Sequence, residues 1–208
     1  MLNESQILSF LLTTVLLTAT PGPDNLMVLS IGISGGRRAG MIFGLGCAVG
    51  CLSHTLLAVV GVSAILAASP TAFMLLKWTG GAYLLWLGIQ ALRHAGTGQL
   101  PSGALQHKPL RSLFLQGLIA NAINPKVVLF FLSFLPQFVN EAQGHVEWQL
   151  GLLGVLFSLQ AAVLFGVLGY FSGAIGAWLS RRPAAGRGLD RATGAIFVAL
   201  GLRMMVSR

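Results

Sequence analysis

The chain has 208 residues and a formal net charge of +8, yet only 9% of its residues are charged and 55% are hydrophobic. A soluble domain carries about 25% charged residues, so this composition excludes one. The basic residues lie in pairs at the ends of apolar stretches, without interleaved aromatic residues, which excludes a nucleic-acid-binding surface. The composition predicts an all-α polytopic membrane protein.

Six stretches are long and apolar enough to cross a bilayer, since a helix needs about 20 apolar residues to do so. The fifth is long enough to require a tilt or a kink at one of its glycines. The one long polar connection, residues 93–111, separates the third stretch from the fourth. The six predicted spans are 5–33, 39–68, 72–91, 112–139, 149–179 and 190–206.

The first stretch is interrupted in its middle by the sequence Pro-Gly-Pro-Asp-Asn at positions 21–25. Each proline lacks an N–H group and clashes with the carbonyl four residues back, so a regular helix cannot continue. We therefore expect the carbonyl groups of Leu17 and Ala19 to lose their helical partners. Such backbone, and a carboxylate such as Asp24, are tolerated at membrane depth only inside protein or beside a water-filled cavity. The interruption predicts a ligand or ion site.

The fourth stretch carries a second interruption, Asn124-Pro125-Lys126. Asp24 lies about eleven residues from the basic turn near Arg37, and Lys126 lies about thirteen residues into its own span, so their depths are similar. Two interpretations are open for this acid and base. They form either a buried ion pair that holds the two halves together or a site for a zwitterion, with Lys126 binding its carboxylate and Asp24 its ammonium group.

Residues around both interruptions form the predicted substrate-binding or gating set. Asn121 and Asn124 fall on one helical face with Gly117, where their amides either line a cavity or bond two helices together. Freed carbonyls and half-helix ends would add acceptors and donors for the same ligand. The full set is Pro21, Gly22, Pro23, Asp24, Asn25, Asn121, Asn124, Pro125 and Lys126.

Two residues are candidates for proton coupling. Asp24 is the first, because a carboxylate in a low-dielectric environment takes up a proton more readily and can release it again during a transport cycle. His54 is the second, because it follows Gly46 and Gly50 on one helical face and is therefore expected to point into the bundle. A purely structural, hydrogen-bonded histidine is the alternative at this position.

The chain also contains an internal repeat. Each half has three spans, the first of them interrupted by proline, and the third spans share the pattern Gly-Ala with a second glycine seven residues later, at 81–88 and 194–201. Because three is odd, the second half must be inverted in the membrane, as in many transporters. We predict one transporter domain, 1–208, with repeat 1 at 1–95, a cytoplasmic connection at 93–111 and repeat 2 at 112–208.

The loops after the first, third and fifth spans hold most of the basic residues, and the other two loops hold none. By the positive-inside rule these three loops should be cytoplasmic and both termini should be outside. The basic residues of the three loops are Arg37, Arg38, Arg93, Lys108, Arg111, Arg181, Arg182, Arg187 and Arg191.

Enzyme activity is not expected from this sequence. An intramembrane aspartyl protease needs two deep aspartates, and only Asp24 is deep, because Asp190 lies among arginines at the end of a span. Cys47 and Cys51 do not form a metal-ligand pattern and are expected to be small buried residues. We therefore predict no cofactor and no metal site.

Five features follow one another along the chain: Pro21-Gly22-Pro23, Gly-Arg-Arg-Ala-Gly at 36–40, His54, the segment 77–88, and Asn124-Pro125-Lys126. In order, length and spacing nearly the whole chain resembles the LysE/RhtB superfamily of amino-acid exporters, closest to its homoserine/threonine exporter branch. The resemblance implies a bacterial inner-membrane protein that exports amino acids with the proton gradient. It also implies that both proline-containing elements belong to the transport site.

The sequence therefore predicts secondary active export of small neutral amino acids, similar to threonine, homoserine or leucine, by proton antiport. Neutrality follows because one deep acid and one deep base balance. The alternatives are an exporter of a metal cation or another metabolite, a passive channel, and a structural membrane protein. Amino-acid substrate, protons and the lipid bilayer are the expected partners, with no nucleic acid, and the sequence is compatible with a homo-oligomer.

Overall fold

The computed structural model describes residues 2–62, 64, 69–93, 95 and 108–206, and the regular secondary structure that these residues form is helical throughout. This confirms the all-α fold class. Two π-helical segments and two 3₁₀ turns continue or connect the α-helices: η1 (Ala58–Val62), η2 (Phe130–Phe134), η3 (Leu135–Phe138) and η4 (Glu141–Gln143). The α-helices are α1 (Glu4–Ala19), α2 (Pro23–Gly35), α3 (Arg37–Leu57), α5 (Pro70–Arg93), α6 (Leu110–Ala122), α7 (Pro125–Leu129), α8 (Val146–Tyr170), α9 (Ser172–Arg181) and α10 (Pro183–Val206).

Three helices in the described part of the chain are each long and apolar enough to cross a membrane: Arg37–Gly61, Thr71–Arg93 and Val146–Tyr170. Two further candidates are bent pairs, α1 with α2 at 57° and α6 with Pro125–Phe138 at 49°. The chain is thus a multi-pass membrane protein with three to five candidate spans. Both bends lie at the predicted proline interruptions, and Pro23 and Pro125 each occupy the first turn of the helix that restarts, where a missing N–H costs nothing.

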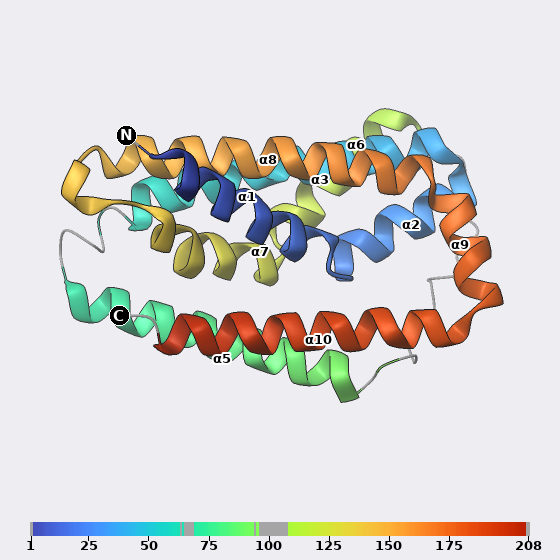
Figure 1. Cartoon of the computed structure of the whole chain (residues 1–208). Coiled ribbons are helices and arrows are strands. Elements are labelled where there is room, and N and C mark those ends of the chain that lie inside the picture. Colours follow the sequence, from blue (N-terminus) through green and yellow to red (C-terminus); the bar gives the residue numbers. More distant parts are fainter. Residues whose placement is uncertain (1, 63, 65–68, 94, 96–107, 207–208) are drawn as a thin grey trace.

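The predicted fifth span, 149–179, is wrong in its second part. Helix α8 ends at Tyr170 and α9 begins at Ser172, so the chain breaks at Phe171 and not at a glycine. Helix α8 has 25 residues, which at about 1.5 Å per residue already exceeds a typical hydrocarbon core. Helix α9 instead lies across the end of the bundle, opposite the end where both chain termini lie (Figure 1).

The predicted sixth span, 190–206, falls within α10, which begins earlier, at Pro183, and is not among the helices that pass as a candidate span. The predicted second span, 39–68, corresponds to α3 with η1, which end at Val62. Its positions 63 and 65–68 lie outside the described residues. So do positions 94 and 96–107 of the polar connection.

Helix α3 packs against its neighbours through a glycine face. A methyl group built on Gly50 would lie 2.8 Å from the carbonyl oxygen of Leu118 on α6, and one built on Gly46 would overlap the carbonyl of Phe114. On the α8 side, a methyl group on Gly44 would lie 2.7 Å from Cβ of Phe165. Only glycine permits these backbone approaches, which are typical of membrane helices. The expected inward face of α3 is therefore confirmed.

Helices α5 and α10 lie side by side and antiparallel (Figure 1). Their glycines make reciprocal contacts. A methyl group on Gly81 would lie 3.1 Å from the carbonyl oxygen of Gly201, and one on Gly201 would lie 2.8 Å from that of Gly81. Gly88 and Gly194 repeat this arrangement at 2.8 and 2.7 Å. Such reciprocity is what a local twofold axis between two antiparallel helices would produce.

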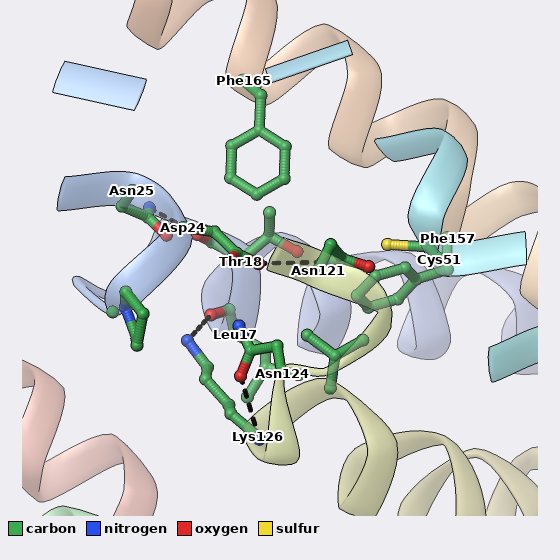
Figure 2. A pocket seen from close by; sticks show the side chains of 13 residues that line it. Leu17, Thr18, Asp24, Asn25, Cys51, Asn121, Asn124, Lys126, Phe157 and Phe165 are labelled. Carbon is green, nitrogen blue, oxygen red and sulfur yellow. Dashed lines mark hydrogen bonds between the residues drawn. The ribbon is translucent and has the colours of Figure 1, made fainter. Parts of the chain in front are cut away.

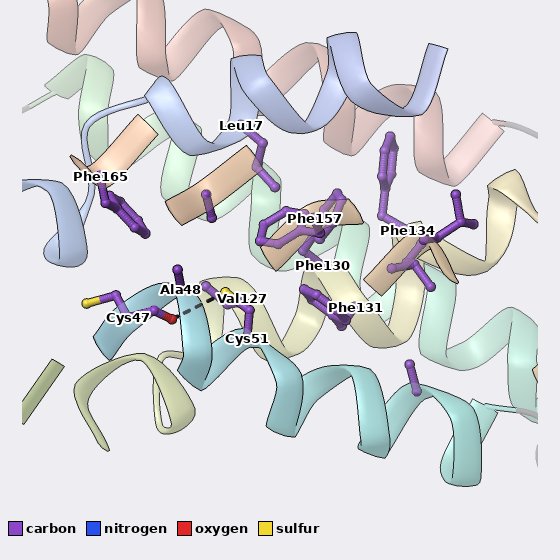
Figure 3. Close-up of a cluster of buried hydrophobic side chains, with 14 of the residues drawn as sticks. Leu17, Cys47, Ala48, Cys51, Val127, Phe130, Phe131, Phe134, Phe157 and Phe165 are labelled. Carbon is purple, nitrogen blue, oxygen red and sulfur yellow. Dashed lines mark hydrogen bonds between the residues drawn. The ribbon is translucent and has the colours of Figure 1, made fainter. Parts of the chain in front are cut away.

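A cluster of buried phenylalanines fills the centre of the bundle beside the two helix breaks (Figure 3). The ring of Phe157 on α8 lies 4.9 Å from that of Phe131 and 5.3 Å from that of Phe130, both in η2. Edge and offset contacts of this kind favour tight aromatic packing. The cluster gives the broken helices a firm apolar support.

Candidate substrate site

The ends of the two broken helices meet at a small cavity (Figure 2). Its volume is about 20 Å³, enough for roughly one water molecule and far too little for an amino acid. In this conformation the cavity therefore cannot hold an amino acid. The cavity is lined by Leu17, Thr18, Gly22, Pro23, Asp24, Asn25, Cys51, Asn121, Asn124, Lys126, Val127, Phe157 and Phe165.

Asp24 lies in the first turn of α2 and is only 5% exposed. Its Oδ2 accepts a hydrogen bond of 2.8 Å from Nδ2 of Asn121, which lies in the last turn of α6. The partial positive charge at the start of α2 also stabilises a carboxylate there. A residue from the first interruption is thus bound to a residue from the second half of the chain.

Lys126 lies in α7 and is 9% exposed. Its side chain extends from the second half of the chain to the end of α1 in the first half. Its Nζ donates to the carbonyl oxygens of Leu17 at 3.2 Å and Thr20 at 3.3 Å. Leu17 was expected to have a freed carbonyl. The second acceptor is Thr20 and not Ala19, because the chain leaves the helix at Thr20 with an extended ψ of 121°.

Asp24 and Lys126 do not bond to each other. Within the part of the chain that the structure describes, no ion pair links them, and each has its own polar partners. In this conformation the buried ion pair that was one interpretation of the sequence is not formed. Two opposite charges line one cavity and remain separate.

Other polar side chains fix the backbone around the breaks. Nδ2 of Asn25 donates to the carbonyl of Thr18 at 2.8 Å, and Nε2 of Gln160 on α8 donates to the hydroxyl of Thr18 at 2.8 Å. Oδ1 of Asn124 accepts from the backbone N–H of Lys126 at 3.0 Å and so caps α7. The freed backbone groups are therefore bonded by side chains, as membrane depth demands.

His54 is fully buried but is not among the residues that line the cavity. Its Nε2 lies 2.9 Å from the carbonyl oxygen of Asn121. A carbonyl only accepts, so Nε2 carries the hydrogen and donates. Its Nδ1 is buried and has no hydrogen-bond partner among the described residues. Asn121 thus contacts His54 through its backbone and Asp24 through its side chain.

The structure brings seven of the nine predicted set residues to the cavity wall: Gly22, Pro23, Asp24, Asn25, Asn121, Asn124 and Lys126. Pro21 and Pro125 are not in the wall and shape the two breaks instead. Sequence reasoning missed the apolar part of the wall, including Phe157, Phe165 and Val127. In a chain this apolar, nothing distinguishes such residues from ordinary core.

The described residues contain no group of three or more histidine, cysteine, aspartate or glutamate side chains that could hold a metal ion. Cys47 and Cys51 are buried free thiols, as the small-buried-residue interpretation expected, and Cys51 also lies in the cavity wall. The polar groups available to a ligand are thus one carboxylate, one ammonium, amides and carbonyls. This set suits a small organic ion better than a metal.

Comparison with known proteins identifies the family to which the chain belongs. A homoserine/homoserine lactone efflux protein of Salmonella typhimurium is 32% identical over 200 residues, covering 96% of each chain. An uncharacterized membrane protein of Vibrio cholerae is 30% identical, covering 97% of each. A leucine efflux protein of Salmonella choleraesuis is 28% identical over 156 residues, covering 75% of this chain and 70% of that protein. No solved structure matches.

The family model described as LysE type translocator matches residues 15–208, which include both helix breaks and every residue of the cavity wall. This match and the full-length relatives confirm the resemblance found in the sequence. They indicate a membrane transporter and not an enzyme. The chain belongs to the LysE type translocator family.

Proposed function

We propose that the protein is a secondary active exporter of small, neutral amino acids that works by proton antiport. The observation that carries this proposal is the cavity itself, where Asp24 and Lys126 are brought together from the two halves without pairing. A zwitterion offers a carboxylate to Lys126 and an ammonium group to Asp24. The relatives named for homoserine and leucine efflux support an amino-acid substrate.

The neutrality of the substrate follows from the charges around the cavity. One acid and one base satisfy the two charges of a zwitterion, and no second carboxylate remains for a cationic side chain. Phe157, Phe165 and Val127 form an apolar part of the wall that suits a short aliphatic or hydroxylated side chain. Lys126 would repel a metal cation, so export of a cation is a weaker alternative.

We assign proton coupling to Asp24 and a structural role to His54. Asp24 is buried in the cavity wall, where substrate and proton compete for the same carboxylate. His54 lies outside the wall and donates to a backbone carbonyl, which fits a residue that holds α3 to α6. Competition for one carboxylate would couple proton entry to substrate exit.

We further propose six spans arranged as two inverted repeats, with α10 as the sixth. The alternating directions of the helices in Figure 1 and the reciprocal glycines of α5 and α10 support this arrangement. Alternating access would then rock one repeat against the other around the cavity. The basic loops would face the cytoplasm and the termini the outside of a bacterial inner membrane.

The test is efflux from proteoliposomes loaded with a mixture of amino acids, with and without an imposed pH gradient. Gradient-dependent loss of one or a few neutral species is expected and would name the substrate. Amino-acid efflux that does not depend on the pH gradient would indicate a passive channel. Retention of every amino acid by folded protein would refute amino-acid export and favour another metabolite.

A further inference from the structure

The ammonium group of Lys126 lies against the end of α1, where Figure 2 shows its hydrogen bond to the carbonyl of Leu17, and the groups around it form a small cage. Two backbone carbonyls, of Leu17 and Thr20, accept from Nζ at 3.2 and 3.3 Å. The ring of Phe197 on α10 lies with its centroid 4.9 Å from Nζ. A methyl group on Gly22 would come within 3.1 Å of the same atom, so the cage is closed on that side by bare backbone.

The chemistry of this cage matches a primary ammonium group. Such a group has three N–H donors and one compact charge. The two carbonyls take two donors, and the aromatic face attracts the charge. The carbonyl end of α1 carries partial negative charge, which adds to the attraction. A quaternary ammonium has no donors for the carbonyls, and an alcohol has no charge for the ring.

We propose that the carbonyls of Leu17 and Thr20 and the ring of Phe197 form a primary-ammonium site. Lys126 fills this site in the present conformation. The ammonium group of the substrate takes it over when Lys126 turns to the substrate's carboxylate, and the N–H donor that the two carbonyls leave free is available to Asp24, which lines the same cavity. The exchange rests on the proposed function, whereas the preference of the cage for primary ammonium groups does not.

The size of the cavity explains why an exchange is needed. A volume of about 20 Å³ cannot hold an amino acid, so part of the wall must move, and the long side chain of Lys126 is its most displaceable member. A zwitterion brings both a carboxylate to receive Lys126 and an ammonium group to replace it at the carbonyls. Every buried charge and carbonyl then keeps a partner, which avoids a large desolvation cost. An amine without a carboxylate offers no new partner to the ammonium group of Lys126, so it would not displace Lys126 from the carbonyls.

The experiment removes the ammonium group of Lys126 from the cage by substitution and supplies a small ammonium ion from solution in its place. Lys126→Ala removes a side chain whose missing part corresponds to n-propylammonium. Thermal unfolding of the purified variant is followed with increasing n-propylammonium chloride, and with tetramethylammonium chloride or 1-propanol as controls. We expect a saturable rise in Tm of about 2–4 °C with n-propylammonium alone, and no rise for the parent protein.

Lys77→Ala is the matched control variant, because Lys77 is a second buried lysine, equally 9% exposed, that lies outside the cage. Equal stabilisation of both variants, or stabilisation by 1-propanol, would mean simple filling of a hole and would overturn the ammonium site. If Lys126→Ala does not fold, Lys126→Met keeps the length of the side chain. That variant should bind isobutylamine about as well as valine, whereas the parent protein should require the carboxylate. If the Lys126→Met variant still required a carboxylate on its ligand, the proposed exchange would be refuted.

The two proposals fail in different ways. If n-propylammonium stabilises Lys126→Ala but the parent protein exports no amino acid, the ammonium site is supported and the exporter is refuted. If the parent protein shows gradient-driven efflux but n-propylammonium does not stabilise the variant, the exporter is supported and the ammonium site is refuted.

Discussion

Asp24 is the residue on which the coupling mechanism depends most. Replacing it with asparagine keeps the shape and an oxygen that accepts from Asn121, but removes the group that exchanges a proton. We expect Asp24→Asn to fold normally and to lower gradient-driven efflux to the level of protein-free liposomes. Glu147→Gln, which changes an exposed acid outside the site, should leave efflux unchanged. Normal uphill export by Asp24→Asn would show that the proton travels elsewhere.

His54 offers a test in the opposite direction. A glutamine at this position places an amide N–H near the site of Nε2 and preserves the donor to the carbonyl of Asn121, yet it takes up no proton. We expect His54→Gln to retain folding and gradient-driven efflux. His54→Ala loses both the hydrogen bond and the packing against Phe131, and it should cost about 2–5 kcal/mol in unfolding free energy. Loss of coupling in a folded His54→Gln protein would restore His54 as a proton carrier.

At the residue scale, the charged part of the site could be predicted because charge and proline are rare and costly in a membrane span. Asp24, Lys126 and the asparagines stand out for this reason. The direction of each side chain could not be predicted. Lys126 bonds to α1 and not to Asp24, which depends on the angle of the bend. Phe197 was missed because an apolar ring in an apolar helix gives no signal.

At the element scale, the tight pairing of α3 with α6 holds Asn121 and His54 in place. We expect Gly46→Ala to push the two helices apart, because the added methyl group would overlap the carbonyl of Phe114. The cost should be about 1–3 kcal/mol, seen as a lower Tm and a loss of efflux. Gly166→Ala on α8 has nothing within 4 Å and should be neutral or slightly stabilising. Equal effects of both variants would contradict the packing role.

The elements themselves show where sequence reasoning holds. Both proline breaks are confirmed, because a proline inside a helix would remove a hydrogen bond and clash with the carbonyl four residues back, so the chain restarts a helix at each of them. The end of α8 was misplaced because Phe171 is as apolar as its neighbours, and neither a proline nor a charged residue marks the break at this position. The π-helical turns at 58–62 and 130–134 were not anticipated either, since neither a proline nor a charged residue marks them in the sequence.

At the scale of the whole molecule, the proposed orientation gives a direct prediction. In a background without Cys47 and Cys51, Glu147→Cys lies in the first turn of α8 and Arg182→Cys lies just after α9, both at exposed positions at opposite ends of the bundle. A membrane-impermeant thiol reagent should label the first in intact cells and the second only in inside-out vesicles. The reverse pattern would place the termini in the cytoplasm.

The small volume of the cavity also bears on how well the protein keeps protons from leaking across the membrane. A proton crosses a protein along a chain of hydrogen-bonded waters, and a space of about 20 Å³ holds roughly one. Phe157, Phe165 and Leu17 line that space. In this conformation the cavity would therefore conduct protons poorly, so the protein would not discharge the proton gradient across the membrane.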